Sequence, residues 1–334
     1  MRATSEPQAA AYAAGSVPPV EEIRDGVFAL PVPMSVPALP YSYCYAIESG
    51  DGQLHLVDTG VDTDENWSHL LGSLKSIGHS VTDVETVTIT HLHIDHAGLA
   101  ARIRSASGAR IRMHTVDDRA WRMGATFAPE DTIQQTLDRW AVPAIYREEI
   151  SKAALRRVAV DSSAQVDDRL DHDDVLVAGT RSLRVIHVPG HTPGHIALAM
   201  ASENIVFSGD HLLPMMFSGI GLGGRSQGDN PVGDYFRSLK KMSDLGDYEV
   251  LPGHGFRFVG LVERCATTLE HHARRAAEIG HLLASDMAQP VWAVAAQVRW
   301  TGGWKELRGT HLFSALSQTE MHMENLRSGR LIGS

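Results

Sequence analysis

Five apolar segments of this chain run directly into a histidine or an aspartate, in turns that are mostly rich in glycine. They are LVDTG at 56–60, THLHIDHAG at 90–98, PGHTPGH at 189–195, FSGD at 207–210 and LPGHG at 251–255. Residues before most of these turns are apolar or alternate in polarity, as is typical of β-strands. If the carboxyl ends of the strands lie at one edge, the five turns meet there. The pattern predicts an α/β fold with a polar site at that edge.

The turn at 90–98 holds three histidines and one aspartate within six positions. On a helix, residues two apart such as His91 and His93 point to nearly opposite sides, whereas on a strand they share a face. His96 stands at the start of the following helix and can turn back toward the same point. We therefore place this cluster at the end of a strand and in the loop that the strand enters.

Together the turns supply five histidines and two carboxylates as candidate metal ligands: His91, His93, Asp95, His96, His191, Asp210 and His254. Seven ligands exceed the needs of one tetrahedral zinc ion but suit two ions that each keep a position for water. The predicted cofactors are two divalent metal ions, with zinc expected first and iron or manganese as alternatives, because imidazole and carboxylate ligands accept all three.

These motifs resemble the metallo-β-lactamase fold superfamily, in its glyoxalase II-like branch of hydrolases, over residues 24–258. The resemblance implies an αββα sandwich with the metals at one edge. It implies that the first metal is bound by His91, His93 and His191, and the second by Asp95, His96 and His254. Asp210 would bridge the two metals, and Asp58 would orient ligands without binding metal.

We expect three parts along the chain. Residues 1–20 are expected to be a mobile tail, and 21–260 a hydrolase domain with a helical insertion at 117–158 that could cover the site. Residues 261–334 read as three helices and a last strand at 330–334. They resemble the small winged-helix domain that follows this fold in some related hydrolases, although this part of the pattern is less specific.

The expected activity is metal-dependent hydrolysis of a small-molecule acyl substrate. A hydroxide held between the metals and oriented by Asp95 would attack the carbonyl carbon of a thioester, with an ester or lactone as close alternatives. A thiolate leaving group needs little protonation, which suits a site with no further obvious acid. For substrate contacts we name Tyr235, Met215 and Phe217, although packing explains these side chains as well. The same applies to Met216, Trp121, Met123 and Phe127.

Several other histidines have less specific signals. His195 and His211 adjoin predicted ligands, and a supporting role and a packing role are equally open for both. We expect four further histidines to lie at the surface or to pack: His114, His187, His271 and His272.

Composition limits the partners. The formal net charge is −10, from 30 Lys and Arg against 40 Asp and Glu, which disfavours nucleic acid because its binding depends on basic side chains. No stretch approaches the length of a membrane span. The only two cysteines, Cys44 and Cys265, lie far apart, which indicates a cytoplasmic protein without disulfides.

Other activities remain open. The rivals are a phosphodiesterase or ribonuclease of the same fold, a β-lactamase of the B3 type, which lacks a cysteine ligand, and a single-iron sulfur dioxygenase. The flavin-linked diiron relatives carry a glutamate where this chain has His93. A DNA-binding role is disfavoured because the candidate recognition helix carries Glu320 and Glu324. We expect Trp292, Trp300 and Trp304 to fill the core of the C-terminal domain or a homodimer interface.

Overall fold

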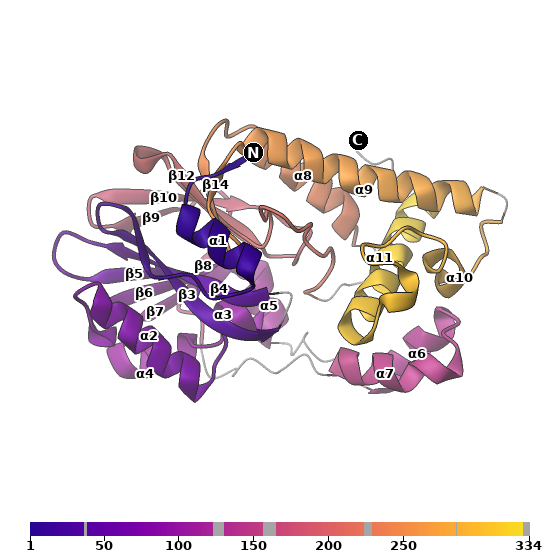
Figure 1. Cartoon of the computed structure of the whole chain (residues 1–334), viewed down its shortest axis with the longest axis horizontal. Coiled ribbons are helices and arrows are strands. Elements are labelled where there is room, and N and C mark those ends of the chain that lie inside the picture. Colours follow the sequence, from indigo (N-terminus) through magenta and orange to yellow (C-terminus); the bar gives the residue numbers. More distant parts are fainter. Residues whose placement is uncertain (37–38, 123–129, 156–164, 224–228, 285, 330–334) are drawn as a thin grey trace.

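The computed structural model describes residues 1–36, 39–122, 130–155, 165–223, 229–284 and 286–329. Two seven-stranded sheets pack face to face, helices cover their outer faces, and further helices gather at one end (Figure 1). The predicted αββα sandwich is confirmed.

The first sheet has the order β2-β3-β4-β5-β6-β7-β8. Its strands are β2 Glu21–Arg24, β3 Val27–Val36, β4 Leu39–Glu48, β5 Leu54–Val57, β6 Val84–Ile89, β7 Arg110–His114 and β8 Asp168–Leu170. Strands β4 and β5 form a hairpin around the turn at 50–52, and β5, β6, β7 and β8 run parallel. The carboxyl ends of β5 and β6 therefore lie at the same edge.

The second sheet has the order β1-β14-β13-β12-β11-β10-β9. Its strands are β1 Arg2–Ala3, β9 Val175–Ala178, β10 Arg181–His187, β11 Ile196–Met200, β12 Ile205–Gly209, β13 Glu249–Pro252 and β14 Phe258–Val259. Only β12 and β13 pair in parallel among the described strands of this sheet, and the other pairs are antiparallel. The ends of β12 and β13 therefore open at one edge, each followed by a predicted ligand.

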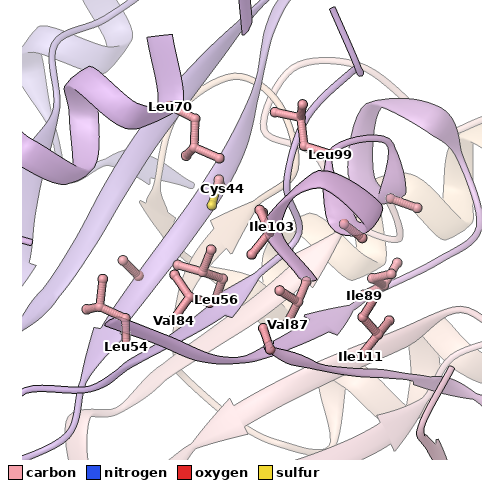
Figure 2. Packing of buried hydrophobic residues seen from close by; sticks show 14 of the residues in the cluster. Cys44, Leu54, Leu56, Leu70, Val84, Val87, Ile89, Leu99, Ile103 and Ile111 are labelled. Atoms are coloured by element: carbon pink, nitrogen blue, oxygen red, sulfur yellow. The ribbon is translucent and has the colours of Figure 1, made fainter. Parts of the chain in front are cut away.

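Strand β4 shows how the layers form. Tyr43 and Tyr45 point into the core between the two sheets, where they meet side chains such as Phe207 and Leu198. Cys44 points the other way, into a core between the first sheet and the helices that cover it (Figure 2). Both faces of β4 are thus buried, which explains its nearly continuous apolar sequence.

Helices cover both outer faces of the sandwich. On the first sheet, α2 Asp64–Ser76 and α4 Ala100–Ser107 bury residues such as Leu70, Leu74 and Ile103 (Figure 2). On the second sheet, α8 Pro231–Ser243 and the start of α9 Leu261–Leu283 bury residues such as Leu239 and Leu261. Short elements complete this part: helices α3 Ile94–Ala97 and α5 Thr115–Arg122, and 3-10 turns Val81–Asp83 and Ala201–Glu203.

The amino-terminal segment differs from the mobile tail that we expected. Arg2–Ala3 pair with β14, and α1 Glu6–Ala14 begins at Ser5, whose hydroxyl accepts a hydrogen bond from the Gln8 backbone N–H. Polar contacts hold the segment in place. Ser5 and Gln8 donate from their side chains to the Glu21 carboxylate at 2.6 and 2.9 Å, and the Arg257 backbone N–H donates to the side-chain oxygen of Gln8 at 2.9 Å. These contacts join residues distant in sequence, so local composition did not reveal them.

The carboxyl-terminal prediction also needs correction. Helices α6 Glu130–Arg139, α7 Ala144–Leu155, α10 Val291–Ala295 and α11 Gly309–Arg327 share one core with the second half of α9, and we call this group the helical unit (Figure 1). The insertion is helical as predicted, but its Ile133, Leu137 and Trp140 are buried against the carboxyl-terminal helices. The expected boundary at residue 260 therefore does not separate two cores.

A winged helix is not found in the described part of the carboxyl-terminal segment. Residues 261–284 and 286–329 contain helices and the 3-10 turn Trp304–Glu306 but no strand, and the predicted strand at 330–334 lies outside the described residues. Trp292 and Trp304 pack edge to face at 5.1 Å within the helical unit. Among the described residues, no helix is both long and apolar enough to cross a bilayer.

Candidate metal centre

All seven predicted ligands lie in loops at the strand ends, at one edge of the sandwich. The loop after β6 carries four of them, and the loops after β10, β12 and β13 carry His191, Asp210 and His254. Their donor atoms form two groups, and within each group all atoms lie within 4.8 Å of one another. One group is His91, His93, His191 and Asp210, and the other is Asp95, His96 and His254.

In the first group, which we call the three-histidine half, three imidazole nitrogens converge. Nδ1 of His93 lies 2.9 Å from Nε2 of His91 and 3.1 Å from Nε2 of His191. Oδ2 of Asp210 is 3.7 Å from the same nitrogen of His191. Three nitrogens and one oxygen at these separations can surround a single tetrahedral cation.

The second group, the Asp95 half, lies against the Asp210 carboxylate of the first group. Nε2 of His254 lies 3.2 Å from Oδ2 of Asp95 and 3.4 Å from Oδ1 of Asp210. Nε2 of His96 is also 3.4 Å from Oδ1 of Asp210. The two oxygens of Asp210 thus face different halves, which is the arrangement that a bridging carboxylate requires.

The outward ring nitrogen of each histidine faces a hydrogen-bond acceptor. His191 donates from Nδ1 to the carbonyl of Gly219 at 2.8 Å, and His254 donates from Nδ1 to the carbonyl of Tyr41 at 2.7 Å. His93 points Nε2 at the carbonyl of Leu222, 3.3 Å away. A proton held on the outer nitrogen leaves the lone pair of the inner nitrogen directed at the centre, as metal binding requires.

Asp58 and Thr90 supply the acceptors for the remaining two histidines. Its Oδ2 accepts from Nδ1 of His96 at 2.8 Å and from the hydroxyl of Thr90 at 2.8 Å, and its Oδ1 accepts from the Thr90 backbone N–H at 2.7 Å. The Thr90 oxygen in turn lies 3.1 Å from Nδ1 of His91. Asp58 therefore supports candidate ligands of both halves, His96 directly and His91 through Thr90. The part played by Thr90 was missed, because a threonine ending a strand carries no local signal.

The donor atoms fit divalent cations. Nε2 of His96, Nε2 of His254 and Oδ1 of Asp210 are buried and have no hydrogen-bond partner among the described residues. Leaving three such atoms unpaired is unfavourable by about 1–3 kcal/mol each. All three belong to neighbouring donor sets of imidazole and carboxylate, so cations bound between them would satisfy every one.

The two halves differ in their protonation. Burial lowers the pKa of His91 well below its ordinary value, and burial together with His191 lowers the pKa of His93 to about 3. Burial alone would also lower the pKa of His254, but Asp210 and Asp95 reverse this effect and raise it to about 10. The histidines of the three-histidine half are thus neutral and can bind a cation directly. The Asp95 half must release the proton of His254 when it binds a cation.

Close packing fixes the carboxylate that both halves share. A Cβ atom on Gly253 would lie 2.4 Å from Oδ1 of Asp210 and 2.7 Å from Cε1 of His96. Only glycine leaves room for these two ligands. His195 supports the same carboxylate, since its Nε2 accepts a hydrogen bond from the Asp210 backbone N–H at 3.1 Å and its ring stacks on His91. We therefore assign His195 a supporting role.

The predicted substrate contacts are less well placed. Tyr235 is fully buried and its hydroxyl donates to the carbonyl of His211 at 2.7 Å, so it packs and supports the backbone after Asp210. Met215 is 55% exposed, and Phe217 stacks on His271 at 3.8 Å. Their contact with substrate stays a prediction.

The remaining candidates pack or lie outside the described residues. His211 and His272 are buried, and His114 stacks on His187 at 3.9 Å. Trp121 is buried in the core between the first sheet and the helices that cover it, whereas Met123 and Phe127 lie outside the described residues.

Thiol chemistry plays no part at this site. Cys44 and Cys265 are free and buried, and burial raises the pKa of both thiols, that of Cys265 to about 12. Both cysteines lie in hydrophobic cores and neither belongs to a donor group. The chain thus resembles neither the hydrolases with a cysteine nucleophile nor the β-lactamases with a cysteine ligand.

Comparisons with known proteins agree with this geometry. The chain is 28% identical to the beta-lactamase-like protein 2 homolog of Caenorhabditis elegans, over 79% of this chain and 72% of that protein. It is 26% identical to a hydroxyacylglutathione hydrolase of Cereibacter sphaeroides, over 71% of each. The crystal structure of a metallo-beta-lactamase family protein from Thermus thermophilus superposes with a TM-score of 0.74 at 27% identity, over 92% of this chain and 95% of that one.

The sequence profile of one family covers most of the sandwich. It matches residues 39–254, a range that begins with β4 and ends at the last predicted ligand, His254. The same range contains both donor groups and Asp58. By sequence, fold and site together, the chain belongs to the Metallo-beta-lactamase superfamily and is a hydrolase of that superfamily.

Proposed function

We propose that this protein is a hydrolase with two divalent metal ions, zinc in the first instance, that cleaves the thioester bond of a small acyl substrate, with ester or lactone substrates as the nearest alternatives. The observation that carries the proposal is the sharing of Asp210 between two donor groups. When bound, the cations would supply Lewis acidity, which favours the ionisation of water near neutral pH and stabilises negative charge on a carbonyl oxygen.

The residues of the chain divide the remaining work. Asp210 holds the two halves at a fixed separation. Asp58 fixes the ring of His96 directly and that of His91 through Thr90. His93 and Asp95 are the two predicted ligands that are partly exposed, whereas the other five are buried. Substrate would therefore approach from the side of His93 and Asp95, where the Asp95 carboxylate can also accept a hydrogen bond from the attacking water.

The thioester preference has two supports. The first is chemical, because a thiolate departs without a strong acid to protonate it. The second is the similarity to hydroxyacylglutathione hydrolase, whose name describes the hydrolysis of an acyl group carried on glutathione. A small neutral or anionic acyl substrate also suits a chain with a formal charge of −10 better than a nucleic acid does.

The test couples metal analysis to a hydrolysis panel. Purified protein loaded with zinc is expected to hold two equivalents and to hydrolyse acyl thioesters faster than esters or lactones. A β-lactam and a bis-nitrophenyl phosphodiester complete the panel. Activity confined to the phosphodiester would replace the proposal with the rival phosphodiesterase, and full activity after complete chelation would refute a metal-dependent mechanism.

Two histidine variants, one at the site and one away from it, separate the loss of a ligand from the effect of substitution itself. His254→Ala removes a donor of the Asp95 half and should reduce the hydrolysis rate at least a thousandfold, together with the loss of one metal equivalent. His281→Ala changes an exposed histidine on α9 and should leave both unchanged. Equal effects of the two variants would contradict the proposed site.

A further inference from the structure

A buried carboxylate that belongs to neither donor group lies behind the metal centre. Asp117 stands in the first turn of α5, directly after β7, and is fully buried. The sequence gives Asp117 no distinguishing signal, because it precedes a second aspartate in an ordinary helical stretch. A carboxylate buried in this way requires a structural reason, since removal from water disfavours its charge.

Three hydrogen-bond donors surround the Asp117 carboxylate. Its Oδ2 accepts from the backbone N–H of Leu92 at 3.0 Å and from the hydroxyl of Thr192 at 2.7 Å. Its Oδ1 accepts from the backbone N–H of Gly194 at 2.6 Å. Donors to a charged acceptor are worth about twice those to a neutral one, so these bonds offset much of the desolvation.

The three donors belong to the two loops that carry the histidines of the three-histidine half. Leu92 lies between the ligands His91 and His93 in the loop after β6. Thr192 directly follows His191 in the loop after β10. These loops come from different sheets of the sandwich. A single carboxylate therefore ties these two loops together.

The loop after β10 is shaped for this contact. A Cβ atom on Gly194 would lie 2.4 Å from the backbone nitrogen of Asp117 and 2.6 Å from its Oδ1. The backbone nitrogen cannot move aside without shifting α5. The second glycine of the PGHTPGH motif is thus explained by the approach of Asp117.

We propose that Asp117 is a positioning residue that fixes His91, His93 and His191 relative to one another and thereby sets the affinity of the three-histidine half for its cation. The inference rests on the proposed function, because it assumes that this half binds metal. Asp117 itself touches neither the cation nor the substrate. Its effect on the reaction passes through the geometry of the three imidazoles.

The decisive variant is Asp117→Asn, and its matched control is Asp118→Asn. An asparagine must direct its NH₂ group at one of the three donors, so at least one hydrogen bond is lost while the shape is kept. Asp118 is the neighbouring buried carboxylate, but it pairs with Arg122 and Arg169 and not with the ligand loops. Both variants remove one buried negative charge from the same turn of α5.

Metal affinity is measured without reference to activity. The metal-free proteins are titrated with Co²⁺, whose visible absorption reports the coordination geometry, in competition with a chromophoric chelator. We expect Asp117→Asn to weaken one of the two equivalents by about 10–100-fold, the range seen when a group supporting a metal ligand is removed. The affinity of Asp117→Asn for the other Co²⁺ equivalent should stay within about threefold of wild type. The same is expected for both equivalents of Asp118→Asn.

Two further variants identify the affected half and protect the test against misfolding. The absorption that weakens in Asp117→Asn should be the one lost in His93→Ala and kept in His254→Ala. Thr192→Val removes a single donor and should shift the same equivalent in the same direction by a smaller factor, even if Asp117→Asn does not fold.

Each outcome decides between the two proposals. Unchanged affinity in Asp117→Asn and Thr192→Val, with wild type binding two ions, would overturn the positioning role alone. Equal losses in Asp117→Asn and Asp118→Asn would also overturn it, since the effect would then be a general one. A wild-type protein that binds no Co²⁺ or Zn²⁺ would overturn the proposed function and this inference together.

Discussion

At the scale of single residues, the centre depends on groups that bind no metal. Asp58 is the clearest example, because its backbone adopts a left-handed conformation at φ 60° to place the carboxylate between Thr90 and His96. Asparagine is among the few residues other than glycine that tolerate this conformation. The charge of Asp58 can therefore be removed without straining the turn.

We expect Asp58→Asn to retain the fold but to lower metal affinity and hydrolysis by about 10–100-fold, because the amide is a weaker acceptor for the His96 ring. Metal content after dialysis and the rate of thioester hydrolysis measure the two effects. Asp244→Asn, at an exposed residue after α8, is the control and should match wild type. A full set of bound metals in Asp58→Asn after dialysis would contradict this role.

Gly253 allows a second test at this scale. In Gly253→Ala the new methyl group would meet Asp210 and His96, so the shared carboxylate must turn away and metal binding should be lost. Gly72→Ala is the control, since nothing lies within 4 Å of its Cβ position in α2 and alanine favours a helix by up to about 1 kcal/mol. Metal stoichiometry and thermal unfolding separate the two results, and two bound metals in Gly253→Ala would refute the expectation.

At the scale of elements, what the sequence predicts well is local. The hairpin of β4 and β5, the strands that end at ligands and helices such as α2 and α11 all follow from apolar periodicity and glycine-rich turns. The candidate ligands were predictable because each lies in a turn or loop that follows a strand. What the sequence could not show is which elements meet. The periodicity around Trp140 predicts a helix but does not predict that this residue packs against α11. The role of Asp117 follows only from three hydrogen-bond donors that are distant from it in sequence.

Helices α9 and α11 also bring together histidines that are buried without charge. Burial and the neighbouring Arg275 lower the pKa of His322 to about 3, and burial lowers the pKa of His272 well below its ordinary value. Below the ordinary pKa of about 6.5, these two imidazoles take up protons in the unfolded chain but stay neutral in the folded one. Stability is therefore lost as the pH falls from about 6.5 toward 3.

His322→Gln should remove part of this acid sensitivity. Between pH 7 and pH 5, its free energy of unfolding should fall by about 2 kcal/mol less than that of wild type, from the linkage of a single such group. Urea unfolding at the two pH values measures the difference. His281→Gln, at an exposed position of α9, should behave as wild type does. Identical pH dependence in His322→Gln would show that the buried histidine does not contribute.

At the scale of the whole molecule, the metal centre lies across the seam of the sandwich. His91, His93, Asp95 and His96 follow a strand of the first sheet, whereas His191, Asp210 and His254 follow strands of the second. Cations bound here join the two sheets, so their free energy of binding contributes directly to the stability of the fold.

Removal of the metals should therefore destabilise the entire chain. At a free zinc concentration about one hundred times the dissociation constant, each independent site adds about 2.7 kcal/mol to the free energy of unfolding. Thermal unfolding before and after chelation measures this contribution. Asp210→Ala should show a much smaller difference in the unfolding temperature before and after chelation. A wild-type unfolding temperature that does not change on chelation would contradict the expected link between the sheets.

Helix α9 has a consequence for how substrate enters and leaves. Its first half is buried in the sandwich through Leu261 and Cys265, and its second half is buried in the helical unit through Ile279 and Leu283 (Figure 1). A rod of 23 residues with no internal proline does not bend at its middle without breaking backbone hydrogen bonds. The helical unit is therefore joined to the sandwich through a continuous helix, which opposes a hinge movement between the two. Substrate entry would then depend on smaller movements, such as those of loops and side chains.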